Sequence, residues 1–492
     1  MINLKKINFS NYFLYLSLII LVFSNKSFAG ENKRLLWKTS AGNSYSHRFF
    51  SGEQINKDNI KNLTKLWTFN SGSTAVQDTV QSPPIFIGDQ LLLVTLVGDL
   101  ISLSPTNGKT LWKKKLKAPL GKRGFTYHES EDSELEGIYV ASGNNIVQLN
   151  KKGEIKKKFL TGVSLVQPFL DEETLYVATL KKGIKAFDLK TKKEIWSTSL
   201  KKNKVNARVW SGFSFDKETK SLFVVTSNPG GIIGEDRSGD DFSASLISID
   251  SDSGKIKWQY KHVVNDLWDF DLISNPIIVK KLKVIDKKKL VNCVIALSKT
   301  GDVIMVDIDT GLPVFDNSYI DVLVQKSDMK NVYTPSSQKF YLKPEKFSNI
   351  EVDLDNDFNH LEEDNLAFMK NKLRHAKSGF YIPTSVNHDV ILYGLHGGAE
   401  WPGATVYRDG NSTNLIIPSN KTPWILRINY QEKKYLDIYN SDYLNKALDL
   451  TLSIRNFLKS FFKKDEKQKN VSSDIESLTK KKSYEVATSK SI

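Results

Sequence analysis

The chain of 492 residues contains one cysteine and four methionines, and beyond its first 23 residues it has no long apolar run. Because Cys293 is alone, no internal disulfide and no covalent haem motif can form. It lies in the apolar stretch Leu290–Leu297, which predicts a buried and inert thiol. No segment after residue 23 approaches the roughly 20 apolar residues that a membrane helix needs, so we expect at most peripheral contact with a membrane.

Acidic residues are the scarcer charge: 55 Asp and Glu oppose 70 Lys and Arg, and the net charge is +15. The lysines are scattered through turns and gathered in the C-terminal tail, and they do not alternate with aromatic residues along one element. This distribution argues against nucleic acid as a partner.

The first 29 residues have the pattern of a secretory signal peptide. Lys5 and Lys6 form a basic start, Tyr12–Phe23 is almost wholly apolar, and Ser27-Phe28-Ala29 supplies small residues for cleavage. Since the apolar stretch is short for a bilayer span, we expect cleavage near Gly30 and export to the periplasm. An uncleaved anchor is the alternative.

One phrase recurs along the chain: an alternating strand, a turn with Asp or Asn, and a second strand that ends in Trp or Phe. Its five copies are Gly98–Trp112, Asn145–Phe159, Gly183–Trp196, Ala244–Trp258 and Asp302–Phe315. They begin roughly 40 to 60 residues apart, which is typical of the four-stranded blades of a β-propeller. A β-sandwich is the alternative, but it offers no reason for the phrase to recur at this spacing. We therefore predict an all-β propeller over residues 30–430, in which each Asp caps its turn and each Trp packs on the next unit.

Residues 431–492 break this pattern. Ser441–Phe462 has apolar residues at helical spacing and is followed by a run rich in lysine, serine and threonine. We expect a helix and a flexible charged tail, or the start of an inserted domain.

The densest group of unusual residues is Asn265–Asp271, in which three carboxylates surround Trp268. Carboxylates are costly to place inside a β-protein unless they are paired or bind a metal. A solvated loop between blades is one interpretation. The other makes Asp269 a general base or a metal ligand beside an aromatic wall, and spacing alone does not decide between them.

The segment Asn265–Pro276 resembles the Asp-Leu-Trp-Asp-x-Asp signature, followed by a proline, of the pyrroloquinoline quinone (PQQ)-dependent alcohol and glucose dehydrogenases. Gln54–Trp67 is similar to the amino-terminal phrase of that family, and Gly397–Gly403 with Pro423–Leu426 is similar to a later one. The resemblance extends over Trp37–Leu426 and implies an eight-bladed quinoprotein propeller. It also implies oxidation of a sugar, polyol or alcohol by hydride transfer to PQQ.

The resemblance assigns roles to individual residues. Asp269 takes the position of the catalytic base and lies close enough to assist the metal, while Lys299 takes that of the cation beside the quinone oxygens. Asn228 matches the asparagine ligand of a calcium-type ion that polarises the quinone. Trp210 stands where the family stacks the flat cofactor. Without the motif, Lys299 would be read as a solvated turn lysine and Trp210 as a core residue.

Four further residues are assigned to the cofactor pocket. Arg123 and His128 resemble the phrase that binds the PQQ carboxylates and lines the pocket in the membrane glucose dehydrogenase branch. Gln81 and Trp401 fall in segments that also line the family's pocket, with core packing as the alternative for both.

Three departures qualify the resemblance. The calcium-binding glutamate has no counterpart between Val177 and Phe187, and no vicinal cysteine pair occurs near Lys117. About six blades' worth of hairpins precede the predicted C-terminal helix, fewer than a closed eight-bladed ring needs. Because Lys299 and His128 are present, the glucose dehydrogenase branch is the closer resemblance.

The enzyme interpretation implies ubiquinone or a cytochrome c as electron acceptor and a sugar, polyol or alcohol as substrate. Two alternatives remain open. One is a truncated or inactive member of the family that stops before a cytochrome domain and the last blades. The other is a non-catalytic periplasmic scaffold built from the same repeats.

Overall fold

The computed structural model describes residues 36–72, 81–95, 98–116, 120–203, 205–228, 241–284, 287–329, 332–348, 351–353, 356–395, 398–410, 412–430 and 484–488. Strands make up most of the regular structure in these ranges, where the helices are η1 (Ile60–Asn62) and α2 (Glu363–Leu373). The predicted all-β class is therefore confirmed. The predicted signal peptide and the helix expected at Ser441–Phe462 lie outside the described residues.

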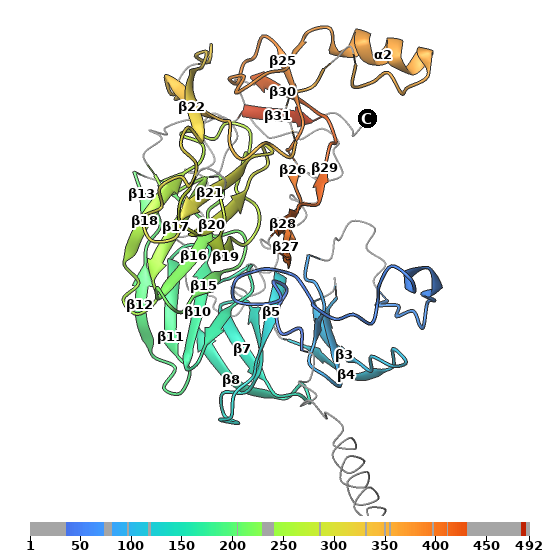
Figure 1. The fold of residues 1–492 in the computed structure, drawn as a ribbon, viewed down its shortest axis with the longest axis vertical. Coiled ribbons are helices and arrows are strands. Elements are labelled where there is room, and N and C mark those ends of the chain that lie inside the picture. Colours follow the sequence, from blue (N-terminus) through green and yellow to red (C-terminus); the bar gives the residue numbers. More distant parts are fainter. Residues whose placement is uncertain are drawn as a thin grey trace, which may run out of the picture.

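Five antiparallel sheets follow one another in the described part of the chain, and in each every strand pairs with the next. The first contains β1 (Ile85–Phe86), β2 (Leu91–Val94), β3 (Asp99–Leu103) and β4 (Thr110–Lys115); the second β5 (Leu120–His128), β6 (Gly137–Ser142), β7 (Asn145–Leu149) and β8 (Ile155–Leu160); the third β9 (Phe169–Asp171), β10 (Thr174–Thr179), β11 (Gly183–Asp188) and β12 (Glu194–Thr198); the fourth β15 (Ser214–Asp216), β16 (Ser221–Val225), β17 (Ser245–Asp250) and β18 (Ile256–Lys261); and the fifth β19 (Ile277–Leu282), β20 (Val291–Leu297) and β21 (Val303–Asp307). Figure 1 shows these sheets fanned about a common centre, as propeller blades are. Their first strands lie innermost, since β5 contacts β9 and β15 contacts β19.

The first four predicted repeats coincide with the third and fourth strands of successive sheets, as in β11 and β12, and the fifth contains β21, the third strand of the three-stranded fifth sheet. In that hairpin Oδ1 of Asp188 accepts a hydrogen bond from the backbone N–H of Thr191 (2.6 Å), which is the predicted capping of the turn. Inner strands such as β6 and β16 are buried along their whole length, so their alternate side chains pack into the layers on both sides of the sheet.

The repeat tryptophans join neighbouring blades. The indole N–H of each donates to a backbone carbonyl in the turn of the following sheet; the pairs are Trp112–Lys151 (2.7 Å), Trp196–Ser251 (2.8 Å) and Trp258–Ile308 (3.1 Å). Each ring also covers a glycine of positive φ in that turn, namely Gly153, Gly254 and Gly311. A Cβ at any of these glycines would approach the indole to less than 3 Å, so turn and tryptophan are matched in shape.

The hydrophobic core is divided into layers between blades. One cluster joins the first and second sheets, a second joins the second and third, and others continue between the third, fourth and fifth. Radial packing of this kind makes each blade depend on its neighbours for burial.

After β21 the described residues form smaller sheets. They contain the pair β22 (Tyr319–Leu323) and β23 (Ser337–Tyr341), the pair β26 (Gly398–Ala399) and β29 (Ser419–Asn420), the pair β27 (Thr405–Asp409) and β28 (Ser412–Ile416), and a sheet of β24 (Ala376–Lys377), β25 (Asp389–Leu392), β30 (Trp424–Tyr430) and β31 (Tyr484–Thr488); the pair β13 (Lys201–Lys202) and β14 (Val205–Asn206) lies earlier in the chain. α2 packs on β25 and β30 through Met369 and Leu373, at the end of the molecule farthest from β3 and β4 (Figure 1). No helix within the described ranges is long and apolar enough to cross a membrane.

An N-terminal segment, Trp37–Arg48, runs along the innermost strands; we call it the axial segment. Its backbone carbonyls accept hydrogen bonds from successive inner elements, in the pairs Phe86–Trp37 (3.0 Å), Tyr127–Lys38 (2.9 Å), Phe215–Ser44 (2.8 Å), Ile278–Tyr45 (3.1 Å) and Val406–His47 (2.9 Å). It therefore links β1, β5, β15, β19 and β27 at the centre of the fold.

Candidate active site

The site is built at one edge of the blades. In an antiparallel meander the start of the first strand and the end of the second meet at the same edge. Asp269 and Asp271 precede β19, Lys299 follows β20, and Asn228 follows β16. Trp210 precedes β15 by the same rule, so elements far apart in sequence present their side chains together.

The segment Asn265–Asp271 is held in a tight turn. Oδ1 of Asp266 accepts hydrogen bonds from the backbone N–H groups of Trp268 (3.1 Å) and Phe270 (2.8 Å). The Trp268 ring is buried, and its Nε1 donates to Ile382 O (2.6 Å). Asp269 lies between these anchors at φ +63°, in the left-handed region that a residue with a side chain rarely adopts. Strained backbone of this kind is typical of functional sites, where the surrounding packing maintains it.

Lys299 joins the two carboxylates of this turn. Its Nζ lies 2.7 Å from Oδ2 of Asp269 and 3.5 Å from Oδ2 of Asp271, and its backbone N–H donates to Asp271 O (3.2 Å). The lysine side chain is 11% exposed and that of Asp269 is 38% exposed. Burial opposes the charge on Lys299, but the neighbouring carboxylates outweigh it and raise the pKa of the ammonium. Asp269 therefore has a fixed cation beside it while one face of its carboxylate stays accessible.

Asp271 is the buried member of the pair. It accepts a hydrogen bond from the backbone N–H of Asn228, which brings the predicted metal ligand to the same place. Burial and the charge of Asp269 raise the pKa of Asp271 well above the usual range of a carboxyl group, against the influence of Lys299. Asp269 and Asp271 thus share one buried lysine, and Asp271 holds a proton more readily than an ordinary carboxyl group.

Arg123, Trp210 and Trp401 form a second group. The guanidinium of Arg123 lies 4.3 Å from the centre of the Trp210 ring and 5.4 Å from that of Trp401, and it donates to Trp210 O (3.1 Å). Burial lowers the pKa of Arg123 to about 10, and the charge of Asp271 opposes this change, so the two groups adjoin. Six of the predicted residues therefore converge: Asn228, Asp269, Lys299, Arg123, Trp210 and Trp401.

Contacts with this assembly are not seen for two predicted residues, His128 and Gln81, in the described part of the chain. His128 ends β5 opposite Gly137, at the other edge of the blade, where its ring meets Tyr139 edge-on with centres 6.2 Å apart. Gln81 is half-buried just before β1, at the edge that carries the site. In the part of the chain that the structure describes, neither side chain forms a hydrogen bond with the converging residues. Their roles in the cofactor pocket stay predictions.

Sequence reasoning missed the network that supports Lys299. The neighbouring Thr300 hydroxyl contacts His262 Nε2 (3.2 Å) and Ser298 Oγ (2.7 Å) and donates to Asp302. Asp302 is bridged in turn by Lys346 Nζ (2.9 Å). Burial lowers the pKa of His262 to about 4, so the ring is neutral at physiological pH. His262 stands in an ordinary strand-end sequence, and only the pairing of blades reveals its partners.

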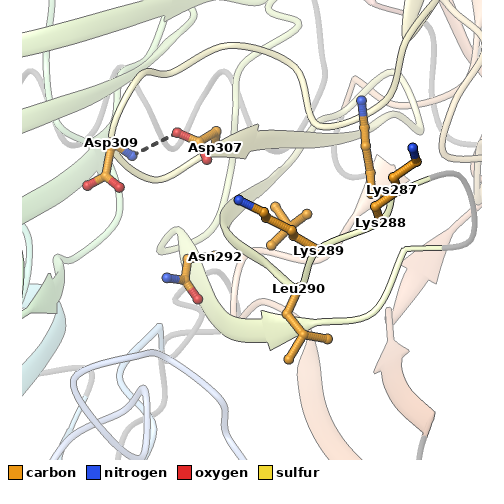
Figure 2. A pocket seen from close by; sticks show the side chains of 8 residues that line it. Lys287, Lys288, Lys289, Leu290, Asn292, Asp307 and Asp309 are labelled. Atoms are coloured by element: carbon orange, nitrogen blue, oxygen red, sulfur yellow. Dashed lines mark hydrogen bonds between the residues drawn. The ribbon is translucent and has the colours of Figure 1, made fainter.

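A surface depression lies away from this assembly. It lies at the edge of the fifth sheet opposite to the site. The turn between β19 and β20, the start of β20 and the end of β21 with the turn that follows it form its walls. Figure 2 shows Lys287, Lys288 and Lys289 around Leu290, with Asp307 and Asp309 on the facing turn. Because it lacks the converging residues, we assign no part of the active site to it.

Comparison with known proteins places these features in context. The family model described as "Glucose/ethanol/alcohol dehydrogenase, beta-propeller domain" matches residues 37–162 and 200–449. Quinoprotein glucose dehydrogenase A of Acinetobacter calcoaceticus is 23% identical over 457 residues, covering 76% of this chain and 55% of that protein. Quinoprotein glucose dehydrogenase of Escherichia coli K12 is 22% identical over 469 residues, covering 80% and 56%. The chain thus spans about half the length of the curated relatives it matches.

Among solved structures, a europium-containing methanol dehydrogenase superposes with a TM-score of 0.57 at 15% identity, covering 82% of this chain and 72% of that one. At this identity the likeness speaks for the fold, and it agrees with the predicted propeller.

Proposed function

The chain belongs to the glucose/ethanol/alcohol dehydrogenase β-propeller family, and from this premise we propose that it is a PQQ-dependent oxidoreductase acting on CH–OH donors. The observation that carries the proposal is the ion pair of Asp269 and Lys299 (2.7 Å) at the edge of the blades. This pair sets a potential base beside a cation, in the same assembly as the indoles of Trp210 and Trp401.

The residues present suit a flat, acidic cofactor. PQQ is a tricarboxylate with a planar ring system, so it requires cationic groups at its rim and broad apolar faces. Arg123 supplies the first and the indoles of Trp210 and Trp401 the second. When bound, the quinone supplies the redox chemistry, accepting a hydride equivalent from the substrate carbon.

The protein's own residues would accept the substrate proton and stabilise developing negative charge. The carboxylate of Asp269 would accept the hydroxyl proton of the substrate as the C–H bond of the substrate breaks, because its side chain is 38% exposed and lies beside the Lys299 ammonium. The Lys299 ammonium provides a preorganised positive charge for oxygen atoms that become more negative during the reaction.

The oxygen atoms also suit a hard cation. Asn228 and Asp269 are the proposed ligands of a calcium-type ion, and Asp271 adds a third oxygen donor beside them. The glutamate ligand of the family has no counterpart here, because the turn at the end of β10 carries Lys181 and Lys182 instead. A bound divalent ion would lower the raised pKa of Asp271 and so favour its ionised form, which can act as a ligand.

We place the enzyme in the periplasm, exported by the N-terminal signal, with a sugar, polyol or alcohol as substrate and ubiquinone or a cytochrome c as acceptor. The pattern of the first 29 residues supports export. Glucose dehydrogenases of this family support a sugar as the first substrate to test.

The test is to titrate the mature protein, from Gly30 onward, with PQQ and Ca²⁺ and to follow dye reduction over a panel of sugars and alcohols. Stoichiometric binding with turnover is expected. Asp269→Asn should bind PQQ as the wild type does and lose turnover roughly 100- to 10,000-fold, the range for a general base. Asp309→Asn, an exposed control, should keep full activity. Absence of PQQ binding by the folded protein would favour the scaffold or the inactive relative.

A further inference from the structure

Arg48 is a half-buried cationic residue without an acidic partner among the described residues. Its Nη1 donates to the backbone carbonyl of Ser46 (3.1 Å), but its Nε is enclosed and has no hydrogen-bond acceptor. Among the residues that the structure describes, no carboxylate forms an ion pair with it. A guanidinium carries five N–H donors, so most of its bonding capacity is unused by the protein.

Other arginines of the fold are satisfied differently. Arg427 makes a forked pair with Asp389 (2.8 and 2.6 Å). Arg123 is stacked on Trp210 and influenced by Asp271. Burial lowers the pKa of Arg48 to about 10, which still leaves the group charged at neutral pH. An uncompensated charge in an enclosed place is unfavourable, and an anion that accepts from the unused N–H donors would offset that penalty.

The position of Arg48 connects it with the candidate active site. It ends the axial segment, and its guanidinium packs on Gly403, where a Cβ would come within 2.8 Å of Cζ. Gly403 lies two residues after Trp401 and also abuts Ser274, three residues after Asp271. The bare glycine at φ +93° thus opens the space that the guanidinium fills. Arg48 therefore lies against the segment that carries Trp401 and close to the segment that carries Asp271.

We propose that Arg48 is an anion-binding residue of the propeller centre. One source is a carboxylate of the quinone, in which case the inference rests on the proposed function. The other source is a small anion from solvent, such as acetate or chloride. The chemistry is the same in both cases: the unused N–H donors of a fixed guanidinium receive oxygen or halide lone pairs.

The experiment compares the full chain with Arg48→Met, Arg48→Lys and the control Arg408→Gln, whose side chain is exposed. Methionine removes an unpaired charge from an enclosed place, so the variant should fold. One arm measures PQQ affinity by quenching of tryptophan fluorescence. The other measures the melting temperature in sulfate-free, chloride-free buffer as sodium acetate or sodium chloride is added, with the organic buffer held constant.

If the cofactor is the source, Arg48→Met weakens PQQ binding roughly 10- to 150-fold, the range for charge-assisted hydrogen bonds. Arg48→Lys retains part of the affinity and Arg408→Gln all of it. If solvent anions are the source, PQQ affinity is unchanged, while acetate or chloride raises the melting temperature of the wild type and of Arg408→Gln but not of Arg48→Met.

The inference is overturned if Arg48→Met equals the wild type in both arms. A wild type that fails to bind PQQ refutes the proposed function alone, because the anion titration still decides the role of Arg48.

Discussion

Replacing Lys299 by Met should destabilise the fold through the carboxylates left behind. Removal of one partner of a buried ion pair costs roughly 3–5 kcal/mol. Asp269 is 38% exposed and can regain water, whereas Asp271 is 5% exposed and cannot. The loss should therefore arise mainly from Asp271 and amount to about 3 kcal/mol, the lower end of that range, because burial already raises the pKa of this carboxyl group and lets it take up a proton.

The same reasoning predicts rescue by a second substitution. Asp271→Asn removes the stranded charge with little change in volume, so the Lys299→Met/Asp271→Asn protein should recover about 2 kcal/mol of the loss. Lys220→Met is the matched control, because Lys220 pairs with Asp252 at 2.6 Å on the surface, with both side chains over 60% exposed. It should change stability by less than about 1 kcal/mol.

The assay is urea unfolding followed by tryptophan fluorescence, with the midpoint and slope compared among the three variants and the wild type. Metal-free buffer is essential, since an added divalent ion could compensate the stranded carboxylates. If Lys299→Met unfolds at the wild-type midpoint, or if Asp271→Asn does not compensate it, the charge balance described for this site is wrong.

Two further predictions concern the supporting structure. Because the pKa of His262 is lowered by burial to about 4, unfolded chains bind its proton first as the pH falls, and stability should decrease by up to about 3 kcal/mol between pH 6.5 and 4. His262→Gln should flatten this part of the stability profile measured by urea unfolding, and an unaltered slope would exclude the histidine as its cause. Trp196→Phe loses the 2.8 Å hydrogen bond to Ser251 O and should cost about 2–3 kcal/mol. Gly254→Ala should lower the thermal midpoint comparably, since its Cβ would lie 2.5 Å from that ring; equal stability of either variant would show that the blades do not depend on this contact.

The blade pattern was predictable because it is local. A hairpin with an Asp-capped turn and a terminal Trp repeats its own chemistry, and strands alternate with a period of two regardless of where they lie. α2 escaped prediction because its sequence is mostly polar and no side chain caps its start. Its Met369 and Leu373 become buried only against β25 and β30.

The candidate site was predictable in part, for a similar reason. The motif around Asp269 marked the turn, and the resemblance supplied Lys299, Asn228, Trp210, Arg123 and Trp401. His128 lies five residues along β5 from Arg123, at the opposite edge of the blade, and its role in the cofactor pocket stays a prediction. The motif also contains Asp271, to which the sequence assigned no role. The structure shows that Lys299 pairs with both Asp271 and Asp269.

The amino-acid sequence by itself determined the repeat, the all-β class and the residue types of the site, because these depend on neighbours within a few positions. Only the tertiary structure decided which charges are paired and which are not. Lys299 meets its two carboxylates across a gap of nearly 30 residues, and Arg48 meets Gly403 from the other end of the chain. Burial and partnership are properties of the assembled blades, and they set the charge balance on which the chemistry depends.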